Sequence, residues 1–146
     1  MNDMESIYTE VITEHSRFPE HKHHLERANC VAPGRNPSCG DEITLELNVR
    51  EGIIREAAFT GVGCAISQAS TDIMIDLLRG RSVTEARRLA TKFIAMVRRE
   101  ITSEEELEEL GEAVALQGIA DMPARVKCAV LAWHTLAEAL PGPEKN

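Results

Sequence analysis

A stretch of alternating apolar and polar residues, 43–49, constrains the fold of this chain more than any other feature. Successive side chains of a strand point to opposite faces, so this period of two predicts a strand half buried in a sheet. Glu51 and Gly52 then supply a turn, and residues 53–60 are expected to return as the antiparallel partner. A further short strand is expected at 29–32, in otherwise polar and irregular sequence. The pattern predicts a small antiparallel sheet of about three strands.

After the predicted strand at 53–60, the hydrophobic period changes to that of a helix, which is expected to stop at Gly80. Two capping-box patterns, which satisfy free backbone N–H groups at a helix N-terminus, then predict the starts of two more helices. The first pattern is Ser82 with Glu85, and the second is Ser103 with Glu106. This part of the chain is therefore expected to be entirely helical.

Two more helices are predicted at the ends of the chain. Residues 4–17 carry apolar side chains at helical spacing before Pro19, and another helix is expected between Pro123 and Pro141. Trp133 is expected in the core on the second of these helices. Because the strands come together before most of the helices, the fold class is α+β, with helices packed on one antiparallel sheet.

Length and charge narrow the classes of function. We expect a single domain over 1–146, with the tail from 141 to 146 frayed. The formal net charge of −8 disfavours nucleic acid and anionic membranes as main partners. No apolar stretch approaches the roughly 20 residues of a membrane span, and the first residues do not form a signal-peptide pattern. We therefore expect a cytoplasmic protein, in which cysteines serve as ligands, nucleophiles or core residues rather than disulfides.

Three of the four cysteines lie in motifs that place sulfur near turns or near the start of a helix. Cys39 lies in NPSCGD, Cys64 in GVGCAIS and Cys128 in PARVKC. Asp41, two residues after Cys39, adds a carboxylate. Three thiolates and one carboxylate suit a borderline-soft dication such as zinc. The spacing alone is equally consistent with three buried or idle thiols.

The position of Cys128 on its predicted helix favours the functional interpretation. At about 100° per residue, Cys128 lies about 160° away from Val126 and from Val130, which are expected to face the core. A cysteine that only filled the core is expected on the face of those valines. Arg125, one turn earlier, shares the face of Cys128.

These motifs resemble those of the IscU/SufU family of iron–sulfur cluster assembly proteins, which is NifU N-terminal-like. The likeness includes the ALQG sequence that begins at Ala115 and runs from the N-terminal helix to Leu140. Two features resemble the SufU branch of the family. Lys127 stands where IscU-type proteins have histidine, and the long interval between Cys64 and Cys128 looks like the insertion of SufU-type proteins.

The resemblance implies a zinc site and a sulfur-transfer role. The implied zinc ligands are Cys39, Asp41, Cys64 and Cys128. Cys39 would accept sulfane sulfur from a persulfide on a SufS-type cysteine desulfurase, a pyridoxal-phosphate enzyme. In the family's mechanism a histidine of the desulfurase replaces the acceptor cysteine on zinc during docking. Arg125 matches the family's arginine near the site and is expected to act with Cys39, and downstream iron–sulfur assembly proteins are the expected recipients.

Two alternatives to a zinc-dependent sulfurtransferase remain at this point. In the first, the same ligands hold a nascent iron–sulfur cluster or iron, as on an IscU-like scaffold. In the second, the chain is a purely structural zinc-binding domain, which would unfold without zinc and keep Cys39 inert. Lys127 in place of histidine favours the sulfurtransferase over the scaffold.

Other features are interpreted as structural. The histidines His15, His21, His23 and His24 could form a second metal cluster, but no firm ligand spacing links them, so a solvated loop is favoured. In relatives this segment is commonly of a His-Tyr-x-x-Pro-Arg-Asn type, from which the present chain departs. Cys30 lies in no motif and is expected to be a bystander thiol.

The predicted insertion is polarised by charge. Basic residues dominate 79–99, and acidic residues dominate 100–112. We favour two solvated helices that attract each other over a surface that steers a partner.

Overall fold

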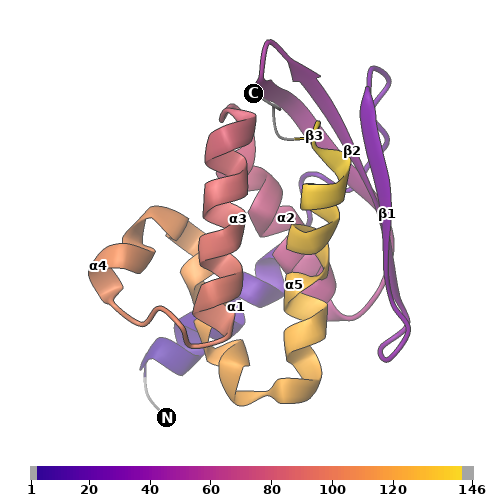
Figure 1. The fold of residues 1–146 in the computed structure, drawn as a ribbon. Helices are drawn as coiled ribbons and strands as arrows, with labels where there is room; N and C mark the ends of the chain where they lie inside the picture. The colour runs from indigo at the N-terminus through magenta and orange to yellow at the C-terminus, as the bar shows by residue number, and fades with distance from the viewer. Residues whose placement is uncertain (1–2, 143–146) are drawn as a thin grey trace.

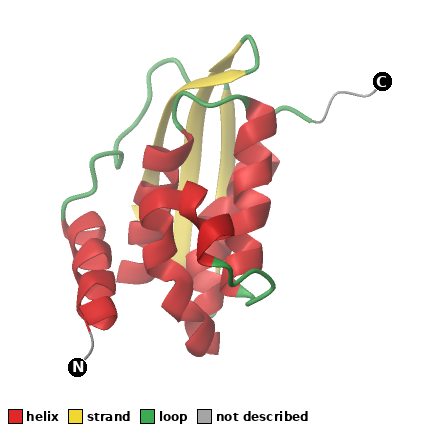
Figure 2. Cartoon of the chain, turned by 90° about the vertical axis from the view of Figure 1, so that its left-hand side faces the viewer, coloured by secondary structure: helices red, strands yellow, loops and turns green. Residues whose placement is uncertain are grey.

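The structure is a computed structural model that describes residues 3–142, and it has the predicted α+β class. Figures 1 and 2 show a three-stranded sheet with the helices gathered on one of its faces. The elements are α1 (Asp3–Arg17), β1 (Cys30–Asn36), β2 (Asp41–Arg50), β3 (Ile53–Val62), α2 (Ala65–Leu78), α3 (Val83–Val97), α4 (Glu104–Leu107), the 3₁₀ helix η1 (Glu108–Asp121) and α5 (Pro123–Ala139). None of the helices in this part of the chain is long and apolar enough to cross a membrane.

The sheet is antiparallel in the order β1-β2-β3. Its register pairs Asn36 with Asp41 and Glu42 with Val62. The end of β1, the start of β2 and the end of β3 therefore lie at the same end of the sheet. The pairing of the strands thus brings two of the cysteine motifs together at this end.

Strand β1 is longer than the predicted strand at 29–32, because it runs on through Pro33 and Gly34 to Asn36. Proline is tolerated here because β1 is an edge strand. Gly34 is required because a Cβ at this position would lie 2.1 Å from Oγ1 of Thr135 on α5. The glycine that weakens the strand pattern in the sequence is the residue that lets α5 lie close against the sheet.

Both predicted serine N-caps are present. The Ser82 side chain accepts a hydrogen bond from the backbone N–H of Glu85, and Ser103 does the same for Glu106. The first cap starts α3, and the second starts the short α4, which continues into η1. The stretch between the second and third motif cysteines is therefore helical as predicted, and consists of α2 followed by α3, α4 and η1 up to the start of α5.

Helix α5 is buried on more sides than its apolar stripe predicts. It packs against β1 and β2 on one side and against α2, α3 and η1 on others. Trp133 is fully buried, as expected, and stacks on Phe93 with ring centroids 4.0 Å apart. The expectation that Cys128 faces away from the core was wrong, because Cys128 is also fully buried, whereas Val126 is only partly buried.

Candidate functional site

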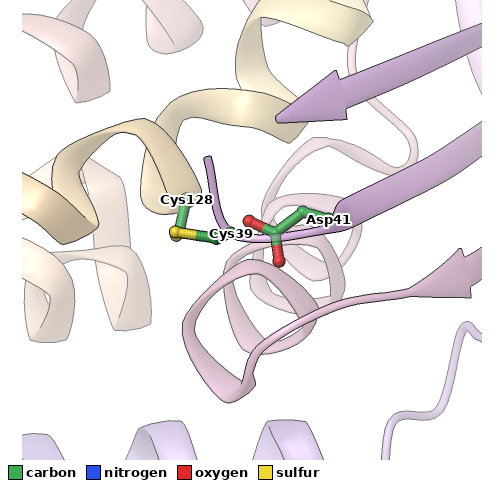
Figure 3. A group of neighbouring side chains, drawn as sticks. All are labelled: Cys39, Asp41 and Cys128. Atoms are coloured by element: carbon green, nitrogen blue, oxygen red, sulfur yellow. The ribbon is translucent and has the colours of Figure 1, made fainter. Parts of the chain in front are cut away.

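The three cysteine motifs meet at the end of the sheet where β2 begins. Cys39 lies in the loop between β1 and β2, and Asp41 is the first residue of β2. Cys64 is the N-cap residue of α2, two residues after the end of β3, and Cys128 lies in the second turn of α5. Figure 3 shows Cys39, Asp41 and Cys128 side by side, with the two thiols adjacent.

Cys39, Asp41 and Cys128 each offer one ligand atom, and these atoms all lie within 4.8 Å of one another. Asp41 and Cys128 are buried, whereas Cys39 is partly exposed. Cys64 is also partly exposed and lies beside this group, since its backbone N–H donates to Oδ1 of Asp41 at 2.8 Å. The structure thus brings three of the four expected ligands into one cluster and places Cys64 next to it.

Asp41 is held in place by three hydrogen-bond donors. Oδ1 accepts from the Cys64 N–H and, at 3.2 Å, from the Ser67 hydroxyl, and Oδ2 accepts from the Asn36 side chain at 3.2 Å. Burial alone would raise the pKa of Asp41, but these three bonds, with a contribution from the neighbouring Cys128 thiol, favour the carboxylate and leave the pKa below its usual value. Asp41 is therefore a fixed negative charge.

The sequence interpretation missed Asn36 and Ser67 as positioning residues. Asn36 donates to Asp41 and also lies 3.5 Å from Sγ of Cys128. The only signal for them was their place within the cysteine motifs. Gly63 has a related role, because a Cβ there would lie 2.7 Å from Oδ1 of Asp41 and 2.5 Å from Oγ of Ser67. Only glycine lets the carboxylate approach the N-terminus of α2 this closely.

The pKa of the Cys128 thiol is set mainly by its burial. Burial, together with hydrogen bonds to Cys39, Asp41 and Cys64, raises the pKa of the Cys128 thiol. A bound dication acts in the opposite sense, because coordinating thiols are deprotonated. Two sulfurs and a carboxylate oxygen, with a third thiol adjacent, form a donor set that fits zinc, which takes thiolate and carboxylate ligands in fourfold sites.

Arg125 lies at the rim of the cluster, in the first turn of α5. Its Nη1 is 3.9 Å from Sγ of Cys39. The pKa of Arg125 is raised, first by its hydrogen bond to Cys128 and then by the charges of Cys64, Cys128 and Cys39. The neighbouring Lys127 is exposed. Of these two cations, the arginine is the one that faces the thiols.

Residues 7–139 match the family model described as the NifU-like N terminal domain. The chain belongs to the IscU/SufU family, which has this domain. It is 40% identical over 134 residues to the iron–sulfur cluster assembly scaffold protein IscU of Thermotoga maritima, covering 92% of each chain. It is 33% identical to the zinc-dependent sulfurtransferase SufU of Bacillus subtilis, covering 94% of this chain and 92% of the relative. The resemblance inferred from the motifs is confirmed.

Solved structures agree with this membership. One is described as a putative scaffold protein for the SUF system from Fervidobacterium islandicum AW-1, with a TM-score of 0.85 and 35% identity. The match covers 92% of this chain and 96% of that one. A second, titled only as a hypothetical protein, has a TM-score of 0.84 and 40% identity. The IscU/SufU fold of this chain is therefore shared along nearly its whole length.

The expectation of a solvated histidine loop was wrong for two of the four histidines. His21 is only 3% exposed, and its Nε2 lies 2.6 Å from Oδ1 of Asp76. His15 bridges Asp72 and Glu112. The carboxylates come from α2 and η1, which are distant in sequence, so no local spacing could reveal them. His24, in contrast, is an exposed residue in a pair with Glu46.

The two charged segments of the insertion attract each other, as expected. Arg88 of α3 forms a bidentate ion pair with Glu109 of η1, and Lys92 contacts the same carboxylate. Hydrogen bonds from Arg88 and then Lys92 lower the pKa of Glu109 to about 2. These contacts join α3 to η1 on the outside of the insertion.

Proposed function

We propose that this IscU/SufU family protein is a zinc-dependent sulfur acceptor that works with a SufS-type cysteine desulfurase and supplies iron–sulfur cluster assembly. The observation that carries the proposal is the asymmetry of the thiol cluster. Cys39 is partly exposed and beside Arg125, whereas Asp41 and Cys128 are buried behind it. Cys64 is also partly exposed, so Cys39 is distinguished by its contact with Arg125 together with its accessibility, while Asp41 and Cys128 remain buried.

The residues that would hold zinc are Cys39, Asp41, Cys64 and Cys128. Bound zinc would keep the thiols deprotonated without taking part in redox chemistry. Asp41 needs no further preparation, because the Cys64 N–H, Ser67 and Asn36 already orient it as a carboxylate. The relative from Bacillus subtilis, named a zinc-dependent sulfurtransferase, supports this assignment.

The transfer step is a thiol–disulfide-type exchange. The Cys39 thiolate attacks the outer sulfur of the persulfide on the desulfurase. A new S–S bond forms on Cys39 as the S–S bond of the donor breaks, and the donor cysteine leaves as a thiolate with the electron pair. Charge is conserved, and no oxidant is needed. Arg125, 3.9 Å from Sγ of Cys39, would stabilise the anionic sulfur before and after the exchange.

A scaffold function is the second candidate, and the relatives supply the observation that favours it. The relatives from Thermotoga maritima and Streptococcus pyogenes, at 40% and 39% identity, are both named IscU scaffold proteins. Cysteine thiolates also hold iron–sulfur clusters, so the same residues would serve a scaffold. Lys127, where IscU-type proteins have histidine, favours the sulfur acceptor.

Native mass spectrometry tests the proposal. The untagged protein is analysed before and after incubation with a SufS-type desulfurase and cysteine, and the adduct is mapped by peptide analysis. One zinc per chain and added sulfur on Cys39 are expected. Cys30→Ser is the matched control, because Cys30 lies outside the cluster and should not affect the adduct.

Three other outcomes would overturn the proposal. An iron–sulfur cluster in place of zinc would establish the scaffold. Zinc without a sulfur adduct, together with unfolding on zinc removal, would establish a structural zinc domain. Sulfur added equally to the Cys39→Ser variant would exclude Cys39 as the acceptor.

A further inference from the structure

A second cluster of potential metal ligands lies where α1 packs against α2 and η1 (Figure 1). His15 comes from the last turn of α1, and Asp72 and Asp76 lie one turn apart on α2. Glu112 comes from η1, immediately after the kink at Gly111. Asp72 is about 12 Å further along α2 than the Cys64 N-cap, so this cluster is separate from the thiols.

The ring of His15 is oriented by a buried carboxylate. Its Nδ1 lies 2.7 Å from Oδ2 of Asp72, whose side chain is 1% exposed. The other oxygen of Asp72 accepts the backbone N–H of His21 at 2.9 Å, which fixes the carboxylate. Metal-binding histidines usually donate one ring N–H to such a carboxylate and present the other nitrogen to the metal. Here Nε2 is the nitrogen that remains.

Nε2 of His15 faces oxygen ligands. It lies 2.9 Å from Oε1 of Glu112. His15, Asp76 and Glu112 each offer a ligand atom, and these atoms all lie within 4.8 Å of one another. Asp76 also belongs to a second group with His21 and Glu20, and Oδ1 of Asp76 is 2.6 Å from Nε2 of His21. Asp76 therefore connects two sets of ligands.

The cluster has more acidic than basic groups. Four carboxylates, those of Glu20, Asp72, Asp76 and Glu112, surround two imidazoles. Within the described residues, no lysine or arginine forms an ion pair with any of the four. Within residues 3–142, the ion pairs that Asp72, Asp76 and Glu112 form are all with histidines. A divalent cation would balance the acidic charge more fully.

We propose that His15, Asp76 and Glu112 form a binding site for a divalent first-row metal ion such as Mn²⁺ or Fe²⁺. Asp72 orients His15, and His21 holds Asp76. Nitrogen and carboxylate oxygen ligands suit these ions, whereas the thiol cluster selects softer ones. The bound ion joins three elements, α1, α2 and η1, and so fixes the N-terminal helix to the body of the protein. This site is independent of the proposed sulfur transfer.

Titration with Mn²⁺, followed by electron paramagnetic resonance of the free ion, tests the proposal on the protein as purified. Mn²⁺ is the probe because it prefers oxygen and nitrogen ligands and competes poorly for thiolates. We expect one bound Mn²⁺ per chain. Glu112→Gln and Asp76→Asn should each weaken binding more than about tenfold, and Asp72→Asn should weaken it about 10- to 100-fold by releasing the His15 ring.

The matched control is His24→Gln. His24 also lies beside a carboxylate, with its Nδ1 3.0 Å from Oε2 of Glu46, but its side chain is 85% exposed and belongs to neither ligand group. This variant should bind Mn²⁺ like the unchanged protein. Glu112→Gln provides the secure test if a buried change unfolds the chain, because the Glu112 side chain is 58% exposed.

Two results would overturn the site. One is the absence of saturable Mn²⁺ binding in the millimolar range, which would make the cluster an ion-pair network only. The other is Mn²⁺ binding that is unaffected by both Glu112→Gln and Asp76→Asn. Because the zinc content and the sulfur adduct are measured separately, failure here would leave the proposed sulfur transfer intact.

Discussion

The thiol cluster and the His15 cluster are built from different parts of the fold. The thiol cluster is formed by residues of a loop, a strand start and the first turns of two helices at one end of the sheet. Its carboxylate, Asp41, is buried and accepts hydrogen bonds from three donors. The His15 cluster joins side chains from the surfaces of packed helices, and its ligands Asp76 and Glu112 are exposed. The first set is sulfur-rich and rigidly held. The second contains only nitrogen and oxygen donors and depends on how the helices pack.

The two clusters should therefore respond differently to movements of the helices. In the thiol cluster, Cys39 and Asp41 are held by the ends of β1 and β2 and should keep their places when α1 moves. A site built between helices should be lost when α1 separates from α2 and η1.

Cys39→Ala should abolish sulfur acceptance while leaving the fold intact. The thiol that attacks the persulfide is removed, but Cys39 is partly exposed and contributes little to the core. The measurement is the sulfur adduct by mass spectrometry, with circular dichroism as the check on folding. Cys30→Ala is the control and should keep the adduct. Normal sulfur loading of Cys39→Ala would refute the acceptor role.

Asp41→Ala should release zinc, with an affinity loss of more than about 100-fold, because a ligand is removed along with the partner of three donors. Competition with a chelator measures the affinity. Asp76→Ala is the matched control from the other region and should retain zinc at the thiol cluster. If both variants lost zinc equally, the two regions would not be independent.

Arg125→Ala should slow sulfur transfer by about 10-fold while leaving the free energy of unfolding nearly unchanged. The guanidinium contacts the Cys39 thiol at the rim of the site, where it is placed to stabilise the anionic sulfur rather than the fold. Single-turnover transfer and thermal unfolding are measured together. Lys127→Ala, an exposed change on the same helix, should alter neither. A large stability loss with normal transfer would make Arg125 a structural residue.

Glu109→Gln should lower the stability only slightly and leave both clusters unchanged, because the Arg88–Glu109 pair is exposed and lies outside them. Since the pKa of Glu109 is lowered to about 2, its contribution is present above the ordinary carboxyl pKa and is lost as the pH falls towards 2. Thermal unfolding against pH measures this. A loss of zinc or of Mn²⁺ in this variant would show that the insertion supports a cluster.

Much of the fold was predictable because its signals are local. The alternation at 43–49 and the capping pair of Ser82 and Glu85 each depend on residues close in sequence, and each appears in the structure as expected. The length of β1 was not predictable, because Gly34 weakens a strand pattern. The reason for a glycine at this position is the close contact of Thr135 on α5, which only the structure shows.

The candidate site likewise has features that the sequence predicted and features that it did not. The motifs around Cys39, Cys64 and Cys128 identified the family from the sequence, since each motif is short and continuous. The burial of Cys128 and the hydrogen bonds of Asn36 and Ser67 to Asp41 required the structure.

The strand and helix periods, the helix starts and the family could be inferred from the sequence, because these depend on neighbouring residues and on specific motifs. The position of His15 between Asp72 and Glu112 is a result of tertiary packing, because these residues are 57 and 97 positions away from His15 in the chain. Local periodicity cannot encode such contacts. They arise when packing of the apolar faces brings α1, α2 and η1 together and leaves their polar side chains to find partners in the shared boundary.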